Sequence, residues 1–220
     1  VIPPDQLFID IGAGSQEEAQ KKVSMGDYVI FDTQYEELSC GMVKAKALDD
    51  RVGCALLLEV LKEPWEDIQL NAVFAVQEEV GLRGARVAAF SVEPDMGLAI
   101  EGTICADIPG TDKEFQATRI GKGAALSIMD GGSIPNQAML KELLRIAEEN
   151  NIPVQFREAT SGGNDAGAIQ QARSGCPVAS VSVPCRYIHT PCSIMSMSDF
   201  EAARRLVILF LKSVEGGFRP

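Results

Sequence analysis

The chain has 220 residues, of which 46% are apolar, so it is long enough to bury a sizeable core in one large domain or slightly more. Its 31 acidic and 20 basic residues give a formal net charge of −11, which opposes a phosphate backbone and argues against nucleic acid as a partner. The sequence contains neither an apolar run that approaches a membrane span nor a basic-then-apolar signal peptide, so we expect no membrane contact.

The cysteines indicate the cellular compartment, and the first residues indicate whether the chain is complete. The six cysteines are scattered and form no Cys-x-x-Cys pair, which fits buried free thiols in a reducing cytoplasm better than a disulfide framework. The chain begins Val1-Ile2-Pro3-Pro4 without an initiator Met, so we expect a processed product or a fragment.

The first forty residues contain short, strand-like segments. Strands are predicted at Leu7–Ile11 and Tyr28–Asp32, with Gly12-Ala13-Gly14 and a capped helix from Ser15 between them. This order is typical of a nucleotide-binding motif, but Glu17 occupies the place of the third glycine. A capped turn in a small β-rich module is therefore the favoured interpretation.

From Met42 onward, predicted strands alternate with predicted helices, and we place a domain boundary near residue 45. This alternation favours an α/β fold with a mostly parallel central sheet covered by helices on both faces. Strands are expected at 42–48, 70–76, 97–100, 124–129, 154–156 and 178–183, and the main helices at about 52–62, 82–90, after Asn136 and after Ser198.

Two adjacent acids follow the predicted buried strand at 70–76. Glu78 and Glu79 end this apolar run, and Gly81 and Gly84 then break it. Carboxyl ends of strands in α/β folds are where ligands bind. Neighbouring side chains of an extended segment point to opposite sides, so one acid could hold a metal while the other faces a substrate. The alternative is a solvated Glu-Glu turn.

Asp49, Glu101 and the single histidine, His189, also fall at predicted strand ends or in loops that follow strands. One imidazole with several carboxylates suits Zn²⁺, Co²⁺ or Mn²⁺. Two such metals would need a bridging carboxylate and would activate a water, and a spare carboxylate would act as general base.

Other interpretations of these residues stay open at this point. Asp49 and Asp50 equally suit the first turn of a helix, where anions favour the dipole. Glu101 could be a turn residue and His189 a structural histidine. A thiolate zinc site with the cysteines on either side of His189 lacks a Cys-x-x-Cys pair. A Ser or Cys nucleophile with His189 as base lacks the Gly-x-Ser-x-Gly elbow.

Five segments, in order and spacing, resemble the M42 family of metallo-aminopeptidases, which includes the tetrahedral and glutamyl aminopeptidases. These segments are ALDDRVG (47–53), VQEEVGLRGA (76–85), IEGTICADIPG (100–110), SGGNDAGAI (161–169) and YIHTPCS (187–193). The resemblance covers nearly the whole chain and implies a cytoplasmic, three-layer α/β hydrolase that removes N-terminal residues from small peptides.

The resemblance also implies two divalent metal ions, zinc or cobalt with manganese as an alternative. By this resemblance Asp49 bridges the two ions, Glu79 and His189 complete the second site, and Glu101 lies on the first. Because the chain has one histidine, the first site is expected to be incomplete.

Five further residues receive roles from the resemblance. Glu78 would be the general base that takes a proton from the metal-bound water, and Asp50 would support the bridging carboxylate. Gly163, Asp165 and the turn that begins at Asp107 would line the substrate cleft.

The resemblance has consequences for assembly as well. Residues 1–44 would be the remnant of a β-rich assembly domain, residues 45–220 would form the catalytic domain without its N-terminal segment, and the protein would be a homo-oligomer between dimer and dodecamer. The missing strands should leave an exposed sheet edge and apolar surface. The alternatives are an inactive or truncated interaction protein, and a glycoside hydrolase with paired carboxylates.

Overall fold

A computed structural model describes residues 2–220, which divide into two compact units, one up to Asp32 and one from Thr33 to Pro220. The first unit contains a 3-10 helix, η1 (Pro4–Gln6), and one short helix, α1 (Gln16–Gln20). Helix α1 begins as predicted, because the Oγ of Ser15 accepts a hydrogen bond from the backbone N–H of Glu18 at 3.2 Å.

The strands predicted at Leu7–Ile11 and Tyr28–Asp32 are wrong, since both segments lack regular secondary structure. Phe8 is 87% exposed and Tyr28 is 98% exposed, so neither segment has a surface that buries its apolar side chains. A strand needs a hydrogen-bonded neighbour, and residues 2–32 contain none. The structure therefore does not show a β-rich module in this part of the chain.

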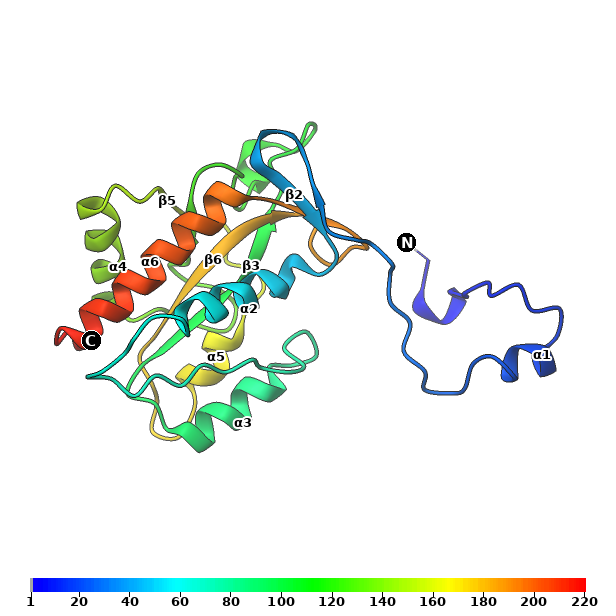
Figure 1. Ribbon diagram of the computed structural model, residues 1–220, viewed down its shortest axis with the longest axis horizontal. Coiled ribbons are helices and arrows are strands. Elements are labelled where there is room, and N and C mark those ends of the chain that lie inside the picture. The colour runs from blue at the N-terminus through cyan, green and yellow to red at the C-terminus, as the bar shows by residue number, and fades with distance from the viewer. Residues whose placement is uncertain (1) are drawn as a thin grey trace. The chain divides into compact units, whose positions relative to one another are not determined.

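The second unit is built on a seven-stranded sheet (Figure 1). Six strands follow the order β1-β2-β7-β6-β4-β5, and β3 pairs with β6. Their bounds are β1 (Glu36–Glu37), β2 (Met42–Ala45), β3 (Gly97–Cys105), β4 (Ala124–Leu126), β5 (Val154–Phe156), β6 (Val178–Arg186) and β7 (Ser193–Ser196). Because β1 and β2 belong to this sheet, the two units divide before the expected boundary near residue 45.

The sheet is mixed, which corrects the predicted mostly parallel arrangement. Only β3 with β6 and β4 with β5 are parallel, whereas β6 runs antiparallel to β4 and to β7, and β2 runs antiparallel to β1 and to β7. Alternating strands and helices indicate an α/β fold, but strand direction depends on which strands become neighbours. The loop at 187–192 returns the chain directly from β6 to β7, with no helix between them.

The buried strand predicted at 70–76 is also wrong. This segment is irregular, with Val73 41% exposed and Val76 66% exposed. Among residues 2–220 no strand pairs with it, and β3 pairs only with β6, so one edge of β3 has no strand neighbour. A groove of about 750 Å³, lined by both β3 and residues 67–79, marks this place. The predicted unpaired sheet edge is therefore present in the described chain, whereas most residues of β3 itself are buried or half-buried.

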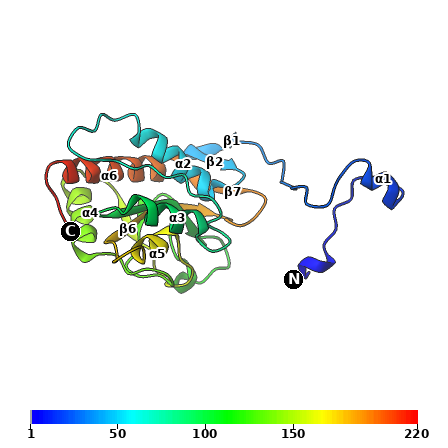
Figure 2. The same cartoon turned by 90° about the horizontal axis from the view of Figure 1, so that it is seen from below.

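Helices cover both faces of the sheet (Figure 2). Helices α2 (Leu48–Val60), α4 (Gln137–Glu149) and α6 (Met197–Glu215) enclose the main core with one face, and α3 (Arg83–Val92) and α5 (Asp165–Gln170) pack on the other. Strand β6 is buried along nearly its whole length between them. Two further 3-10 helices, η2 (Ser39–Gly41) and η3 (Lys113–Phe115), complete the secondary structure of this unit in the described chain.

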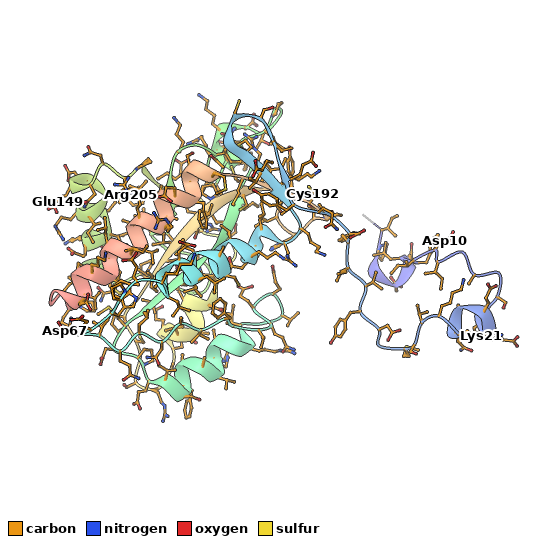
Figure 3. The ribbon with its side chains drawn as sticks, viewed as in Figure 1. Asp10, Lys21, Asp67, Glu149, Cys192 and Arg205 are labelled. Carbon is orange, nitrogen blue, oxygen red and sulfur yellow. The ribbon has the colours of Figure 1, made fainter. Side chains whose placement is uncertain are left out.

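Polar side chains fix the ends of the core helices. Asn136 caps α4 as predicted, but α6 begins after Ser196 and not at the predicted cap, Ser198. Asp199 is instead 1% exposed and accepts hydrogen bonds from two backbone N–H groups of the loop before β4. Arg205 on α6 lies near Glu149 at the end of α4 (Figure 3), and donates to the backbone oxygen of Asn150 at 3.1 Å.

All six cysteines are free, as expected, but only three of them, Cys105, Cys176 and Cys185, are buried. Within residues 2–220, no helix combines the length and the hydropathy that a bilayer crossing requires. The cytoplasmic location stays a prediction.

Candidate metal centre

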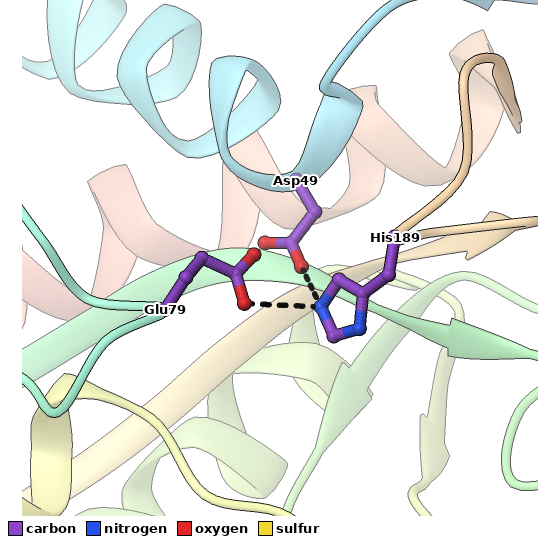
Figure 4. Close-up of side chains that lie close together, drawn as sticks. All are labelled: Asp49, Glu79 and His189. Carbon is purple, nitrogen blue, oxygen red and sulfur yellow. Dashed lines mark ion pairs between the residues drawn. The ribbon is translucent and has the colours of Figure 1, made fainter. Parts of the chain in front are cut away.

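Three residues that are far apart in the sequence meet at one point of the second unit. Asp49, Glu79 and His189 each offer one ligand atom, and these atoms lie within 4.8 Å of one another (Figure 4). The Nε2 atom of His189 is 3.4 Å from Oδ2 of Asp49 and 3.2 Å from Oε2 of Glu79. Two carboxylates and one imidazole form a donor set that suits a divalent ion of the zinc type.

Asp49 is placed by the irregular start of α2. Asp49 and Asp50 have non-helical backbone angles inside this helix, and the peptide bond between them is cis. The Oδ1 atom of Asp50 accepts hydrogen bonds from the backbone N–H of Gly53 at 2.9 Å and of Gly102 at 3.1 Å. Asp50 therefore joins the first turn of α2 to strand β3, next to the carboxylate that faces His189.

Glu78 and Glu79 lie in a tight loop rather than at the end of a strand. The backbone oxygen of Glu78 accepts from the N–H groups of Gly81 and Leu82, which closes a turn directly after the acids. Gly81 has φ +114°, and a Cβ on Gly84 would lie 2.4 Å from the backbone nitrogen of Val76. Both glycines are thus required by the loop, for different reasons.

His189 is carried by the loop between β6 and β7. Its backbone lies in the left-handed region at φ +59°, and its side chain is 62% exposed. The Oγ1 of Thr190 donates to the backbone oxygen of Tyr187 at 2.7 Å, which closes this loop. Among residues 2–220 no cysteine joins the metal-ligand group, so the thiolate alternative is not supported.

Glu101 lies on β3, outside the three-residue group. Its Oε1 accepts a hydrogen bond from Nδ2 of Asn164 at 2.8 Å and one from Oγ of Ser182 at 3.2 Å. The negative charges of Asp49 and Asp50 both act on it, so Glu101 belongs to the same acidic centre.

The surroundings of this centre disfavour the charged form of four of its carboxylic acids. Burial is the main cause that raises the pKa of Asp49 to about 6, of Glu78 to about 7, and of both Asp50 and Glu101 to about 8. Neighbouring carboxylates add to each shift, and His189 opposes it at Asp49 and at Glu78. A divalent cation is the kind of group that would stabilise so many acids together.

The predicted cleft residues are found in two places. Asp165 is the first residue of α5, and its Oδ1 is buried without a hydrogen-bond partner among residues 2–220. Gly163 lies in the exposed loop before it, where a Cβ would be 3.4 Å from the backbone nitrogen of Gly132. Both are therefore close to Asn164 and so to Glu101.

Asp107 has a structural contact network of its own. Its carboxylate accepts from Nε of Arg186 at 2.6 Å, from the thiol of Cys105 at 2.9 Å, and from the backbone N–H of Ile120 at 3.0 Å. Burial pushes the pKa of Asp107 upward, but the hydrogen bonds from Arg186 and Cys105 outweigh it and leave this pKa below its usual value.

The partners of Glu101 were not predicted from the sequence. Asn164, Ser180 and Ser182 are all buried and hydrogen-bonded beside it. One signal was available, because the two serines alternate with apolar residues in the strand Val-Ala-Ser-Val-Ser-Val and so mark a polar stripe on one face of a buried strand.

The comparisons with known proteins agree with one another. The sequence profile of M42 glutamyl aminopeptidases matches residues 1–206. An aminopeptidase homologue from Acetivibrio thermocellus is 40% identical over 92% of this chain and 61% of its own length. An aminopeptidase structure from the archaeon Desulfurococcus kamchatkensis has a TM-score of 0.84 at 37% identity, with 96% of this chain and 62% of that chain covered.

A further solved structure, the TET1 peptidase of Pyrococcus horikoshii, matches with a TM-score of 0.75 at 32% identity, over 90% of this chain and 58% of that chain. That peptidase can assemble into a tetrahedron or a large octahedral shell. The present chain belongs to the M42 glutamyl aminopeptidase family. It spans about 60% of the length of the curated relatives that it matches first.

The Asp107 network predicts a pH-dependent loss of stability. Since the pKa of Asp107 is lowered in the folded protein, its stabilising effect is complete above the ordinary pKa and disappears as the pH falls through the lowered one. Asp107→Asn should lower the free energy of unfolding at pH 7 by about 1–3 kcal/mol, measured by urea denaturation.

The difference between the Asp107→Asn variant and the parent should shrink below the lowered pKa. Asp112→Asn is the matched control, because Asp112 is exposed, and its effect should stay within about 0.5 kcal/mol. A constant difference from pH 7 to pH 2 would contradict this account.

Proposed function

We propose that this chain carries the catalytic centre of a metal-dependent aminopeptidase, which hydrolyses the first peptide bond of small peptides. The observation that supports this most directly is the convergence of Asp49, Glu79 and His189 from three separate segments in a chain of the M42 family. The activity, the peptide substrates and the metal dependence are all part of the proposal.

Asp49, Glu79 and His189 would hold one divalent cation, with Zn²⁺ or Co²⁺ preferred and Mn²⁺ as an alternative. Asp49 and Glu101 would hold a second cation, and the set of ligands for this second site would be incomplete within these 220 residues. When bound, such ions polarise the scissile carbonyl and lower the pKa of a water molecule.

Glu78 is our candidate for the proton carrier. It is next to Glu79 in sequence, but it is not a member of the three-residue ligand group, which leaves its carboxylate available to a water molecule or a substrate. Its pKa is raised to about 7, mainly by burial, and a base of this strength can both accept a proton and return it to the leaving amine near neutral pH. Asp50 would act through the position that it gives to Asp49.

The cleft beside this centre would be lined by the loop that contains Gly163 and Asp165 and by the turn that begins at Asp107. In this turn the Asp107 carboxylate would maintain the backbone course, because Arg186, Cys105 and Ile120 already donate to it.

Glu78→Gln tests the assignment of the proton carrier. The amide keeps the size of the side chain but cannot accept the proton, so kcat for an aminoacyl p-nitroanilide should fall about 10²–10⁴-fold. Cation content, measured by elemental analysis, should equal that of the parent chain, because Glu78 is not a ligand.

Glu148→Gln is the matched control for Glu78→Gln, since Glu148 is an exposed residue of α4, and its activity should be parental. Parental turnover in Glu78→Gln would show that another group carries the proton.

Removal of the cation separates the proposal from its rivals. A chelator should abolish peptide hydrolysis, and added Zn²⁺, Co²⁺ or Mn²⁺ should restore it. His189→Ala should lower the cation content of the purified chain under the same conditions. Hydrolysis of a polysaccharide that persists in chelator would favour the glycoside hydrolase, and no peptide hydrolysis even with added cations would favour an interaction protein.

The protein would also form a homo-oligomer, between a dimer and a dodecamer. This proposal is supported by the shell-forming TET1 neighbour, and light scattering coupled to size exclusion measures it directly. A monomer at every concentration would exclude it.

A further inference from the structure

Glu101 lies in a polar stripe that the strand pairing creates. In the parallel ladder, Glu101 is the Cα partner of Ser182, and Ala99 is the partner of Ser180. Side chains two residues apart on a strand lie on one face, so Ser180, Ser182 and Glu101 share the face on which α5 packs. Asn164, which directly precedes α5, lies beside them.

Only one oxygen of Glu101 is used by this stripe. Both Asn164 and Ser182 donate to Oε1, at 2.8 and 3.2 Å, and among residues 2–220 no hydrogen bond reaches Oε2. The two donors are themselves fixed, since Asn164 is 3% exposed and Ser182 is 1% exposed.

Asn164 is held from both of its functional ends. Its Oδ1 accepts from the backbone N–H of Ala166 at 2.9 Å and so caps α5, and its Nδ2 also contacts Oγ of Ser180 at 3.2 Å. The amide therefore cannot turn its donor away from Glu101 without losing the helix cap.

We propose that Asn164 and Ser182 are positioning residues that hold Oε1 of Glu101, so that Oε2 alone is presented to a divalent cation. This inference rests on the proposed function and adds to it the residues that orient this ligand. Two neutral donors favour the carboxylate form of a buried acid and fix its rotamer. Residues that hydrogen-bond to metal ligands without binding the metal commonly have this effect.

The one-oxygen presentation also narrows the class of cation. A ligand that offers a single oxygen suits Zn²⁺ or Co²⁺ with few ligands, whereas Ca²⁺ takes six to eight oxygens and commonly binds a carboxylate through both. We therefore expect Ca²⁺ to compete poorly at the Glu101 site.

The test is calorimetric titration of Co²⁺ into the full 220-residue chain, with the visible absorption of bound Co²⁺ as a second readout. Glu101→Gln identifies the binding event that uses Glu101, because that event is lost. Ser182→Ala should weaken the same event by about tenfold and leave any other event unchanged.

Ser127→Ala is the matched control, since Ser127 is 3% exposed and, among residues 2–220, no hydrogen bond joins it to Glu101 or Asn164. This control should change the Co²⁺ affinity by less than about twofold, compared with the roughly tenfold loss expected for Ser182→Ala. Asn164→Ser keeps an oxygen for the α5 cap without adding a charge and is too short to reach Glu101, so it should weaken the Glu101 event while its thermal midpoint stays near that of the parent.

Each outcome of the titration has a definite meaning. Parental affinity in Ser182→Ala, equal losses in Ser182→Ala and Ser127→Ala, or a Glu101→Gln variant that keeps every Co²⁺ event of the parent chain would overturn the positioning role and leave the proposed function standing. No Co²⁺ binding to the parent chain would overturn the proposed function, and this inference with it.

Discussion

The hydrogen bonds of the Asp50 carboxylate are the interaction on which the rest of the centre depends. One oxygen accepts from Gly53 on α2 and from Gly102 on β3, so a single side chain connects the helix to the strand. The approach is possible only because both partners are glycines: a Cβ on Gly53 would lie 2.5 Å from the backbone oxygen of Ile100, and one on Gly102 would lie 3.1 Å from Cβ of Asp49. The position of Asp49 opposite His189 follows from this junction.

Charge is the second constraint, and it connects stability with function. Six acids, Asp49, Asp50, Glu78, Glu79, Glu101 and Asp165, act on one another around a single imidazole. Crowding of so many carboxylates in partly buried surroundings is unfavourable without a compensating positive charge. The same arrangement that is unfavourable for the polypeptide alone is therefore suited to bind divalent cations, and the backbone glycines and neutral donors fix its geometry without adding charge.

The open edge of β3 shows how the fold and the centre share one boundary. The groove beside this edge is lined by apolar residues of α2, α6 and β3 and also by Asp49, Glu78 and Glu101. Residues 70–76 lie along this groove as an irregular segment. Their apolar, β-branched composition is typical of a strand, but a strand also needs a neighbour, and that requirement is not visible in a local window.

The sequence by itself determined the family, the chemical character of the centre, the caps of α1 and α4, and the acids and histidine that meet, because motifs and local periodicity are properties of short windows. Only the tertiary structure decided the mixed direction of the sheet, the absence of strands at 7–11, 28–32 and 70–76, the contacts of Asp107 with Arg186, and the hold of Asn164 and Ser182 on Glu101. Each of these depends on hydrogen bonds between residues that are distant in the chain, and such partners are chosen by packing.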